Sequence, residues 1–393
     1  MKKLLFVINN MDIGGIQKSL AELLKAISDR YDITLFCSRH TGEYLKHIPK
    51  TIKVLPENPY AAASEQNLAT CRSQGFKFFI FRLFCSSWSK LFGKGFPAKL
   101  LTKKIGKISG SYDIAISYSQ PIADHDFCNL TNEIVLDCCP ADYKITFLHC
   151  DFASYGGNTA RNRRLYRRFD AVAAVSDSVK RCFLAVMPEM EGRVFTVRNC
   201  CDSQEILRLS NENPVVYNRK CLVTVVRLSK EKGLLRCIPL FKRLKEDGFS
   251  FEWHIIGGGP LYQSLGDAIS EYGMNDCIFL EGEQINPYRF LKNADYFFLP
   301  SYHEAAPIVF DEAMCLGLPI LTTRTLSADE LVSERKIGIV CDNSDDKIYD
   351  MLKYALNLDE KIKVPELLPD NMACITQFDN LCSYVMKNKE SKT

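Results

Sequence analysis

Short apolar runs alternate with helical patterns along the chain, and this alternation constrains the fold more than any other feature of the sequence. The run LLFVI (4–8) is followed by the helical pattern GGIQKSLAELLKAISDR (14–30) and then by DITLF (32–36). Further runs of strand length lie at 51–55, 112–118, 144–150, 171–176 and 193–198. Strands that alternate with helices at this spacing predict a parallel, doubly wound sheet with helices on both faces.

The alternation starts again in the second half of the chain. Apolar runs lie at 221–228, 251–259, 277–282, 296–300, 319–323 and 338–341, with helical patterns between several of them. A chain of 393 residues is long enough for two cores. The sequence therefore predicts an α/β fold of two doubly wound domains, 1–199 and 221–370, joined by a polar linker, 200–220. We expect a final helical segment, 371–393, to close back toward the N-terminal domain.

Charge and cysteine content argue against two classes of protein. The formal net charge is only +3, which does not favour a nucleic-acid-binding protein. The 17 cysteines are scattered through apolar runs, and no CxxC occurs. We therefore expect reduced thiols in the core and no metal site.

The N-terminus and the apolar runs also bear on location. MKKLLFVINNMDIGG has a short apolar run and no small-residue cleavage site, so it favours a buried first strand over a signal peptide. No run of about 18 apolar residues occurs, so no membrane span is predicted. We expect a cytoplasmic protein.

Ligands of open parallel sheets bind at the carboxyl ends of the strands, and glycines mark two such positions. Gly14 and Gly15 follow the first strand, and Gly257, Gly258 and Gly259 follow a strand of the second domain. Because glycine has no Cβ atom, a ligand could approach the backbone closely at these positions. A tight turn explains the glycines equally well. The spacing is not GxGxxG and no acid follows the second strand, so an NAD site is not favoured.

Three polar side chains are also expected at strand ends. Arg227 and Lys232 follow the first strand of the second domain. The planar guanidinium of an arginine and the compact ammonium of a lysine together suit a diphosphate. Lysines and arginines are, however, common on any surface. His149 lies at the end of the run 144–150 and precedes Asp151. For His149, a catalytic or orienting role and a purely structural role both stay open.

Two glutamates stand in a run that is mostly apolar. The segment HEAAPIVFDEAMCLGLP (303–319) places Glu304 and Glu312 eight positions apart. A proline suits the first turn of a helix, and the sequence GLP ends one. We therefore predict a helix over 307–316, with one glutamate in the entry loop and the other inside the helix.

The start of this helix is predicted to bind oxygen atoms. Ala305 and Ala306 cannot cap it, so the N–H groups of residues 308–310 are left for a phosphate or for sugar oxygens. The two carboxylates can accept hydrogen bonds from the vicinal hydroxyls of a pyranose or a ribose. The alternative is a salt-bridged pair in the core.

Together these segments resemble the retaining glycosyltransferases of family 4. Glu304 and Glu312 match the EX7E motif of that family. The resemblance covers nearly the whole chain, through GGIQKSL, FLHCD, FDAVAAVSDSVK, VVRLSKEKG, IIGGGP, FLEG with LKNADYFFLPS, and HEAAPIVFDEAMCLGLPIL. It implies the GT-B fold, in which two Rossmann-like domains face each other across a cleft.

The resemblance implies a role for each matched residue. Arg227 and Lys232 would grip the donor diphosphate, Glu304 would bind hydroxyls of the transferred sugar, and Glu312 would bind the ribose of the nucleotide. Further contacts are implied for Gly14, Gly15, Gly257, Gly258, Gly259, Gly282 and the amides of Ile308 and Val309, with His149 near the reacting sugar. Ala305 and Ala306 replace glycines that the family often has, so the fine contacts with the donor are expected to differ.

The implied reaction is transfer from a nucleotide diphosphate-sugar, the co-substrate, without a metal or another cofactor. The Arg/Lys pair and a helix dipole would neutralise the departing diphosphate, and front-face attack would retain the anomeric configuration. Two alternatives stay open. One is another nucleotide-sugar enzyme of the same fold, such as an isomerase or a phosphorylase. The other is a membrane-associated binding or scaffold protein with a degenerate site.

The stretch 75–110 contains eight Lys or Arg, no Asp or Glu, and many Phe and Leu. It indicates a basic amphipathic surface that could lie on anionic lipid, or else core helices with solvated lysines. Since the family usually binds its acceptor in the N-terminal domain, a saccharide or polyprenyl-diphosphate-linked acceptor at the inner face of the cell membrane is expected. The implied setting is bacterial surface polysaccharide assembly.

Overall fold

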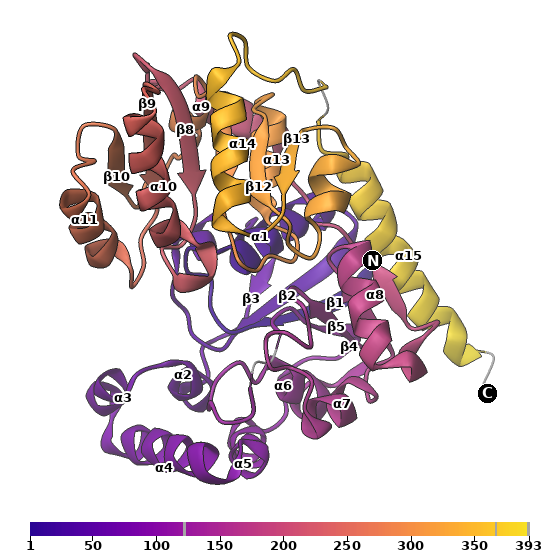
Figure 1. Ribbon diagram of the computed structural model, residues 1–393. Helices are drawn as coiled ribbons and strands as arrows, with labels where there is room; N and C mark the ends of the chain where they lie inside the picture. Colours follow the sequence, from indigo (N-terminus) through magenta and orange to yellow (C-terminus); the bar gives the residue numbers. More distant parts are fainter. Residues whose placement is uncertain (121–122, 366–367, 391–393) are drawn as a thin grey trace. The chain divides into compact units, whose positions relative to one another are not determined.

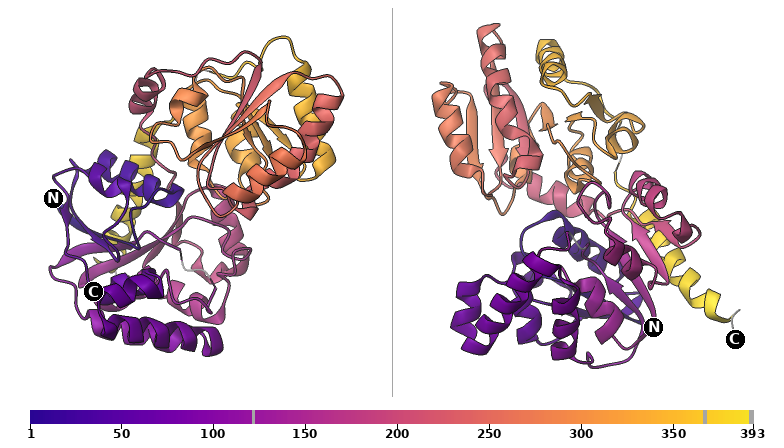
Figure 2. Two further views of the ribbon diagram at one scale, coloured as in Figure 1. Left: turned by 90° about the vertical axis from the view of Figure 1, so that its left-hand side faces the viewer. Right: turned by 60° about the horizontal axis from the view of Figure 1, so that its bottom comes forward.

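The computed structural model describes residues 1–120, 123–365 and 368–390. The chain divides into two compact α/β units (Figure 1). The first combines Met1–Cys200 with the C-terminal helix α15 (Asn371–Glu390), and the second is Cys201–Asp370. In each unit a parallel sheet has helices on both faces (Figure 2).

The first unit is built on a seven-stranded sheet with the order β3-β2-β1-β4-β5-β6-β7. All neighbouring pairs are parallel. The strands are β1 (Lys2–Ile8), β2 (Tyr31–Cys37), β3 (Lys53–Val54), β4 (Tyr112–Ser117), β5 (Ala141–Leu148), β6 (Ala171–Ala174) and β7 (Val194–Thr196). The strand order reverses between β1 and β4, and such a switch point is where doubly wound sheets bind ligands.

Helices cover this sheet and extend beyond it. They are α1 (Gly15–Ile27), α2 (Pro59–Glu65), α3 (Leu68–Gln74), α4 (Phe76–Phe92), α5 (Gly95–Ile105), α6 (Thr131–Cys138), α7 (Ala160–Tyr166) and α8 (Asp177–Val186). Helix α15 belongs to the same unit because Phe378 is fully buried, with its ring 6.1 Å from that of Phe6. Tyr31 Oη also donates a hydrogen bond of 2.7 Å to Asp379.

The second unit has a six-stranded parallel sheet with the order β10-β9-β8-β11-β12-β13. The strands are β8 (Lys220–Val225), β9 (Phe251–Ile256), β10 (Ile278–Gly282), β11 (Tyr296–Leu299), β12 (Ile320–Thr323) and β13 (Gly338–Cys341). Its helices are α9 (Ser203–Ser210), α10 (Leu234–Glu246), α11 (Tyr262–Glu271), α12 (Tyr288–Leu291), α13 (Ile308–Cys315) and α14 (Asp345–Asn357). The strand order reverses between β8 and β11, so those two strand ends are where a ligand is expected.

Two apolar clusters lie on the two faces of this sheet. One contains Phe241 of α10 and Leu352 of α14, and the other contains Phe310 of α13. The range 200–220, predicted as a linker, contains α9, which the Asp202 side chain caps by accepting a 3.0 Å hydrogen bond from Glu205 N. Ile206 of α9 joins the second cluster, because an amphipathic helix must bury its apolar side.

All 17 cysteines are free thiols, and thirteen of them are buried. They pack as small apolar side chains, as the sequence predicted. Among the described residues, no helix combines the length and the apolar composition that crossing a membrane requires.

Candidate functional site

The loops that follow β8 and β11 in the second unit are held together by backbone contacts. Gly233 has φ +68°, and a Cβ atom there would lie 2.2 Å from Pro300 O, so only glycine fits. The N–H of Tyr302 donates a 2.8 Å hydrogen bond to Glu231 O. The 3₁₀ turn Lys230–Lys232 therefore lies beside the loop that enters α13.

Lys232 and Glu304 form an ion pair across these two loops. Lys232 Nζ lies 2.6 Å from Glu304 Oε1, and Ser301 Oγ donates to the same oxygen at 2.7 Å. The side chains keep 20% and 10% of their exposure, so the pair lies at the edge of the core and not within it. The second oxygen of the Glu304 carboxylate has no hydrogen-bond partner among the described residues, which leaves it for a ligand.

Helix α13 is slightly shorter than predicted. It covers Ile308–Cys315, and Pro307 is its N-cap, without a side-chain cap. The prediction that all three first N–H groups are unpaired is wrong for Phe310, whose N–H donates to Pro307 O at 3.1 Å, a tight first turn. The amides of Ile308 and Val309 have no partner among the described residues.

The other predicted charged residues have different surroundings. Glu312 lies inside α13 and is 3% exposed, so it is far less accessible than Glu304. Arg227 is exposed in the loop after β8. Within the described part of the chain, no hydrogen bond or ion pair joins Arg227 to Glu304.

At two of the glycines that were predicted to contact a ligand, the conformation and packing of the backbone already require glycine. Gly257 has φ +139°, and a Cβ atom there would lie 1.9 Å from Val226 O. Gly259 has φ +150°, and its Cβ atom would lie 2.5 Å from Leu228 O. The sequence left two explanations open for these glycines, a bound ligand or a tight turn. A tight turn packed against the loop after β8 accounts for both positions.

At Gly258 and Gly282, no backbone atom of the described residues lies close to the position that a Cβ atom would occupy. A Cβ atom on Gly258 would meet the Glu283 side chain, 2.4 Å from Oε1. Gly282 has φ +69°, and its Cβ atom would meet nothing within 4 Å. Open space next to Gly282 is compatible with a bound ligand.

Gly14 and Gly15 do not form a turn with positive φ. Gly14 has φ 177°, which is extended backbone, and Gly15 is the first residue of α1. A Cβ atom on Gly15 would meet nothing within 4 Å. The tight-turn explanation is therefore wrong here, and no conformational requirement of the fold explains Gly15.

His149 follows β5 in the first unit, as expected, and its ring is enclosed. Its ring centroid lies 4.7 Å from that of Tyr118 and 5.8 Å from that of Phe147. The backbone N–H of His149 donates to Gln120 Oε1 at 2.9 Å. Burial lowers the pKa of His149 from 6.5 to about 4. The imidazole is therefore neutral near pH 7. Its Nε2 is buried without a hydrogen-bond partner among the described residues.

Sequence reasoning missed the residues that support His149. Tyr118 Oη lies 2.8 Å from Ser19 Oγ, and Ser19 Oγ donates to Asn199 Oδ1 at 2.6 Å. Because the Ser19 hydroxyl donates its only proton to Asn199, the Tyr118 hydroxyl is the donor in its hydrogen bond with Ser19. This buried chain fixes the tyrosine ring against which His149 packs. No sequence signal could show it, because its members come from three distant segments.

Metal binding has no evident site in the part of the chain that is described. No group of three or more His, Cys, Asp or Glu side chains there is placed to hold a metal ion. The expectation that the chain has no DxD motif in a loop is wrong, because Asp124 and Asp126 form the sequence DHD. Asp124 lies 3.6 Å from Arg161 Nη1, in an ion pair.

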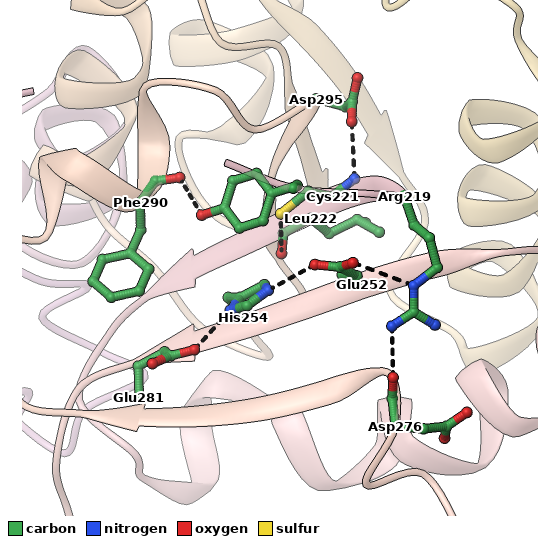
Figure 3. Close-up of polar contacts among 10 residues, drawn as sticks. Arg219, Cys221, Leu222, Glu252, His254, Asp276, Glu281, Phe290 and Asp295 are labelled. Atoms are coloured by element: carbon green, nitrogen blue, oxygen red, sulfur yellow. Dashed lines mark hydrogen bonds and ion pairs between the residues drawn. The ribbon is translucent and has the colours of Figure 1, made fainter. Parts of the chain in front are cut away.

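A second polar cluster in the second unit is structural (Figure 3). His254 Nδ1 lies 2.7 Å from Glu281 Oε1, and its Nε2 lies 3.3 Å from Glu252 Oε2. Arg219 Nε donates to Glu252 Oε1 at 3.2 Å, and Arg219 Nη2 donates to Asp276 O at 2.6 Å. Because a carboxylate contacts each ring nitrogen, His254 has no nitrogen left for a substrate.

Sequence comparisons find similarity to known glycosyltransferases over part of the chain. Residues 207–365 match the family model "Glycosyl transferases group 1". The amylovoran biosynthesis glycosyltransferase AmsK of Erwinia amylovora is 31% identical over 173 residues, 42% of each chain. A Campylobacter jejuni relative is 26% identical over 167 residues, 42% of this chain and 44% of its own. Its name is N-acetylgalactosamine-N,N'-diacetylbacillosaminyl-diphospho-undecaprenol 4-alpha-N-acetylgalactosaminyltransferase. The matches thus span less than half the length of these relatives.

Solved structures of similar fold cover the whole chain. A variant of S. aureus TarM, in complex with fondaparinux, alpha-GlcNAc-glycerol and UDP, has a TM-score of 0.67 at 11% identity. That match covers 97% of this chain and 100% of the other. Anabaena HepE with UDP and glucose has a TM-score of 0.63 at 15% identity, covering 98% and 95%. With two parallel-sheet units of Rossmann type, this chain has the GT-B fold.

Proposed function

We propose that this chain is a retaining glycosyltransferase that moves a sugar from a nucleotide diphosphate-sugar to a saccharide or lipid-linked acceptor in polysaccharide assembly. The observation that carries the proposal is the Lys232–Glu304 pair at the start of α13. The pair lies at the strand ends where the sheet order reverses, which is the usual ligand position of such sheets.

The chemistry of the pair suits a sugar attached to a phosphate. An ammonium group has three donors, and Glu304 occupies one, so Lys232 keeps two for phosphate oxygens. The second oxygen of Glu304 can accept a hydrogen bond from a sugar hydroxyl. The amides of Ile308 and Val309, at the positive end of the α13 dipole, add two more donors for anionic or hydroxyl oxygens.

Departure of the diphosphate is the step that these groups assist. The bond between the anomeric carbon and the phosphate oxygen breaks as the acceptor oxygen attacks from the same face. The leaving phosphate takes the proton of the acceptor hydroxyl, so atoms and charge balance. Cations and amides that face the developing charge stabilise this transition state, and we propose that they replace a metal ion.

Residues of the first unit are proposed to serve substrate hydroxyls. Neutral His149, with its unpaired Nε2, can accept or donate one hydrogen bond without introducing charge. The open space at Gly15 leaves room for a substrate group beside the start of α1. The C. jejuni relative, whose name includes a diphospho-undecaprenol acceptor, supports a lipid-linked acceptor for this chain.

The direct test is a donor panel. The purified chain is incubated with UDP-, GDP- and ADP-sugars, with and without a chelator, and nucleotide release and the anomeric configuration of the product are followed by NMR. We expect release from one nucleotide class, retention of configuration and activity in chelator. Absence of binding and turnover with every donor would contradict the proposal, and an inverted product would contradict retention.

A further inference from the structure

Helix α4 in the first unit has large apolar side chains on its outer side as well as on the side that is covered. Phe78, Phe81 and Cys85 point into a small core shared with neighbouring helices. In Figures 1 and 2, α3, α4 and α5 lie together at the outer side of this unit. A surface helix normally has polar and charged residues on the face opposite the core. The outer face of α4 therefore lacks the covering that its composition calls for.

The uncovered face is made of large apolar side chains. The exposed ones on α4 and at the start of α5 are Phe76, Ile80, Leu83, Phe84, Leu91, Phe92 and Phe96. On α4 the first five follow one another at helical spacing, so they form one face. Phe76 is 70% exposed and Leu91 is 73% exposed, at the two ends of that face. Large exposed apolar side chains gathered on one helix face are typical of an interaction site.

Aromatic rings gather at one end of this face. The Trp88 ring lies 5.8 Å from Phe84, 5.1 Å from Phe92 and 5.0 Å from Phe96. The chain has only two tryptophans, and the other, Trp253, is fully buried in the second unit. Tryptophan is enriched at membrane–water boundaries, and helices that lie in this boundary carry Trp, Phe and Leu on their apolar face.

Positive charge surrounds the apolar face. Of the eight basic residues in 75–110, Arg82 donates to the carbonyl of Ser64, and Lys94 is buried. The other six are exposed: Lys77, Lys90, Lys99, Lys103, Lys104 and Lys107. No acid occurs in this range, although acidic and basic residues nearly balance over the whole chain. The surface therefore attracts an anionic partner over its full length.

We propose that the outer surface of α4 and α5 docks on an anionic lipid bilayer, with α4 lying parallel to the membrane plane. Apolar rings would enter the headgroup boundary while the flanking lysines contact lipid phosphates. Both signals are needed, because one weak signal alone gives marginal binding. A second copy of the chain fits the surface poorly, since two identical surfaces would bring their lysines together. This inference goes beyond the transfer reaction, and its evidence does not depend on it.

Trp88 provides the measurement. The full chain is mixed with vesicles of phosphatidylcholine alone, or with one-third phosphatidylglycerol, at low and high salt. We expect the emission to shift to shorter wavelength and to be quenched by brominated lipid only with the anionic vesicles, and less at high salt. Trp88→Phe should lose the response, because Trp253 is already buried.

In vesicle sedimentation, matched variants separate the contribution of the lysines to binding from that of the apolar side chains. Lys77→Gln/Lys90→Gln/Lys99→Gln should weaken partitioning about a hundredfold, since each lysine near an anionic surface contributes about 1 kcal/mol. Lys242→Gln/Lys361→Gln/Lys363→Gln, an equal charge change in the second unit, should have little effect.

Phe76→Ser/Leu91→Ser should weaken partitioning at least about tenfold, because burying one large apolar side chain contributes roughly 1.5–3 kcal/mol. Val216→Ser/Ile285→Ser, at two apolar positions of the second unit that are at least as exposed, is its control. Circular dichroism and the unfolding midpoint verify that each variant folds.

Three results would overturn the proposal. One is equal binding of the lysine variant and its control. Another is equal binding to neutral and anionic vesicles. The third is concentration-dependent dimerisation in light scattering that Phe76→Ser/Leu91→Ser abolishes without any lipid, which would assign the surface to a second copy. Because each result concerns binding alone, a failure here leaves the donor panel unaffected.

Discussion

Lys232 Nζ lies 2.6 Å from Glu304 Oε1, although 72 residues separate them in the chain. The two residues come from loops at adjacent strand ends, β8 and β11. Each was selected from the sequence for a separate ligand contact, and the structure shows that they also hold each other.

The ion pair should be measurable as a coupling energy. We expect Lys232→Met, Glu304→Gln and the double variant to give a coupling of about 1–3 kcal/mol in urea unfolding, because the pair is partly buried and bonded. The exposed pair Lys242–Glu246, at 3.8 Å, is the control and should couple by less than about 0.5 kcal/mol. Equal coupling in both pairs would show that the loop pair is only a surface contact.

Glu304→Gln should separate activity from stability. The amide keeps the size of the side chain but loses its charge, so we expect kcat/KM for transfer to fall at least about a hundredfold. The unfolding midpoint should move by only a few degrees, as for a change of about 1 kcal/mol. Glu246→Gln, at an exposed position of α10, should leave kcat/KM unchanged. A collapsed fold without a specific activity loss would assign Glu304 a structural role.

His149 should make stability depend on pH. Because burial lowers its pKa in the folded state from 6.5 to about 4, the unfolded chain takes up the proton first. Its contribution is therefore complete above pH 6.5 and falls as the pH drops toward 4, by up to about 3 kcal/mol. Urea unfolding at several pH values should show this slope in the wild type and in the control His47→Gln, whose side chain is exposed. His149→Gln should lose it, and an unchanged slope would exclude His149 as its source.

Gly15→Ala tests whether the open space beside α1 serves a substrate. Alanine meets no neighbour there and favours the helix, so stability should be unchanged or should rise by up to about 1 kcal/mol. If a substrate approaches this backbone, KM for donor or acceptor should rise at the same time. Unchanged kinetics would show that Gly15 has no part in binding.

Gly257 and Gly282 form a matched pair for the glycine loops. Gly257→Ala forces a Cβ atom against Val226 O in addition to the positive φ, and should destabilise by at least about 3 kcal/mol. Gly282→Ala meets no atom, so only the φ cost of about 1–2 kcal/mol applies. Urea unfolding midpoints compare the two, and equal values would contradict the close packing at Gly257.

Much of the fold follows from local sequence. The alternation of apolar runs predicted every strand of both sheets within a few residues. Most of these strands are buried on both faces, and such a strand needs an unbroken apolar run. It also placed Lys232, Arg227 and His149 after strands, which is why they were candidates at all. Glu304 stood out because an acid is unusual in an apolar segment.

Tertiary structure decided what these residues do. The Lys232–Glu304 pair depends on the close passage of Gly233 past Pro300, and the neutral state of His149 depends on packing against Tyr118. Whether a glycine serves a ligand or the chain's own backbone, as at Gly15 and Gly257, depends on which atoms surround it. Sequence periodicity fixes which residues face a core, since that is a local property. Contacts between distant segments and the burial of single groups arise only when the strands and loops come together.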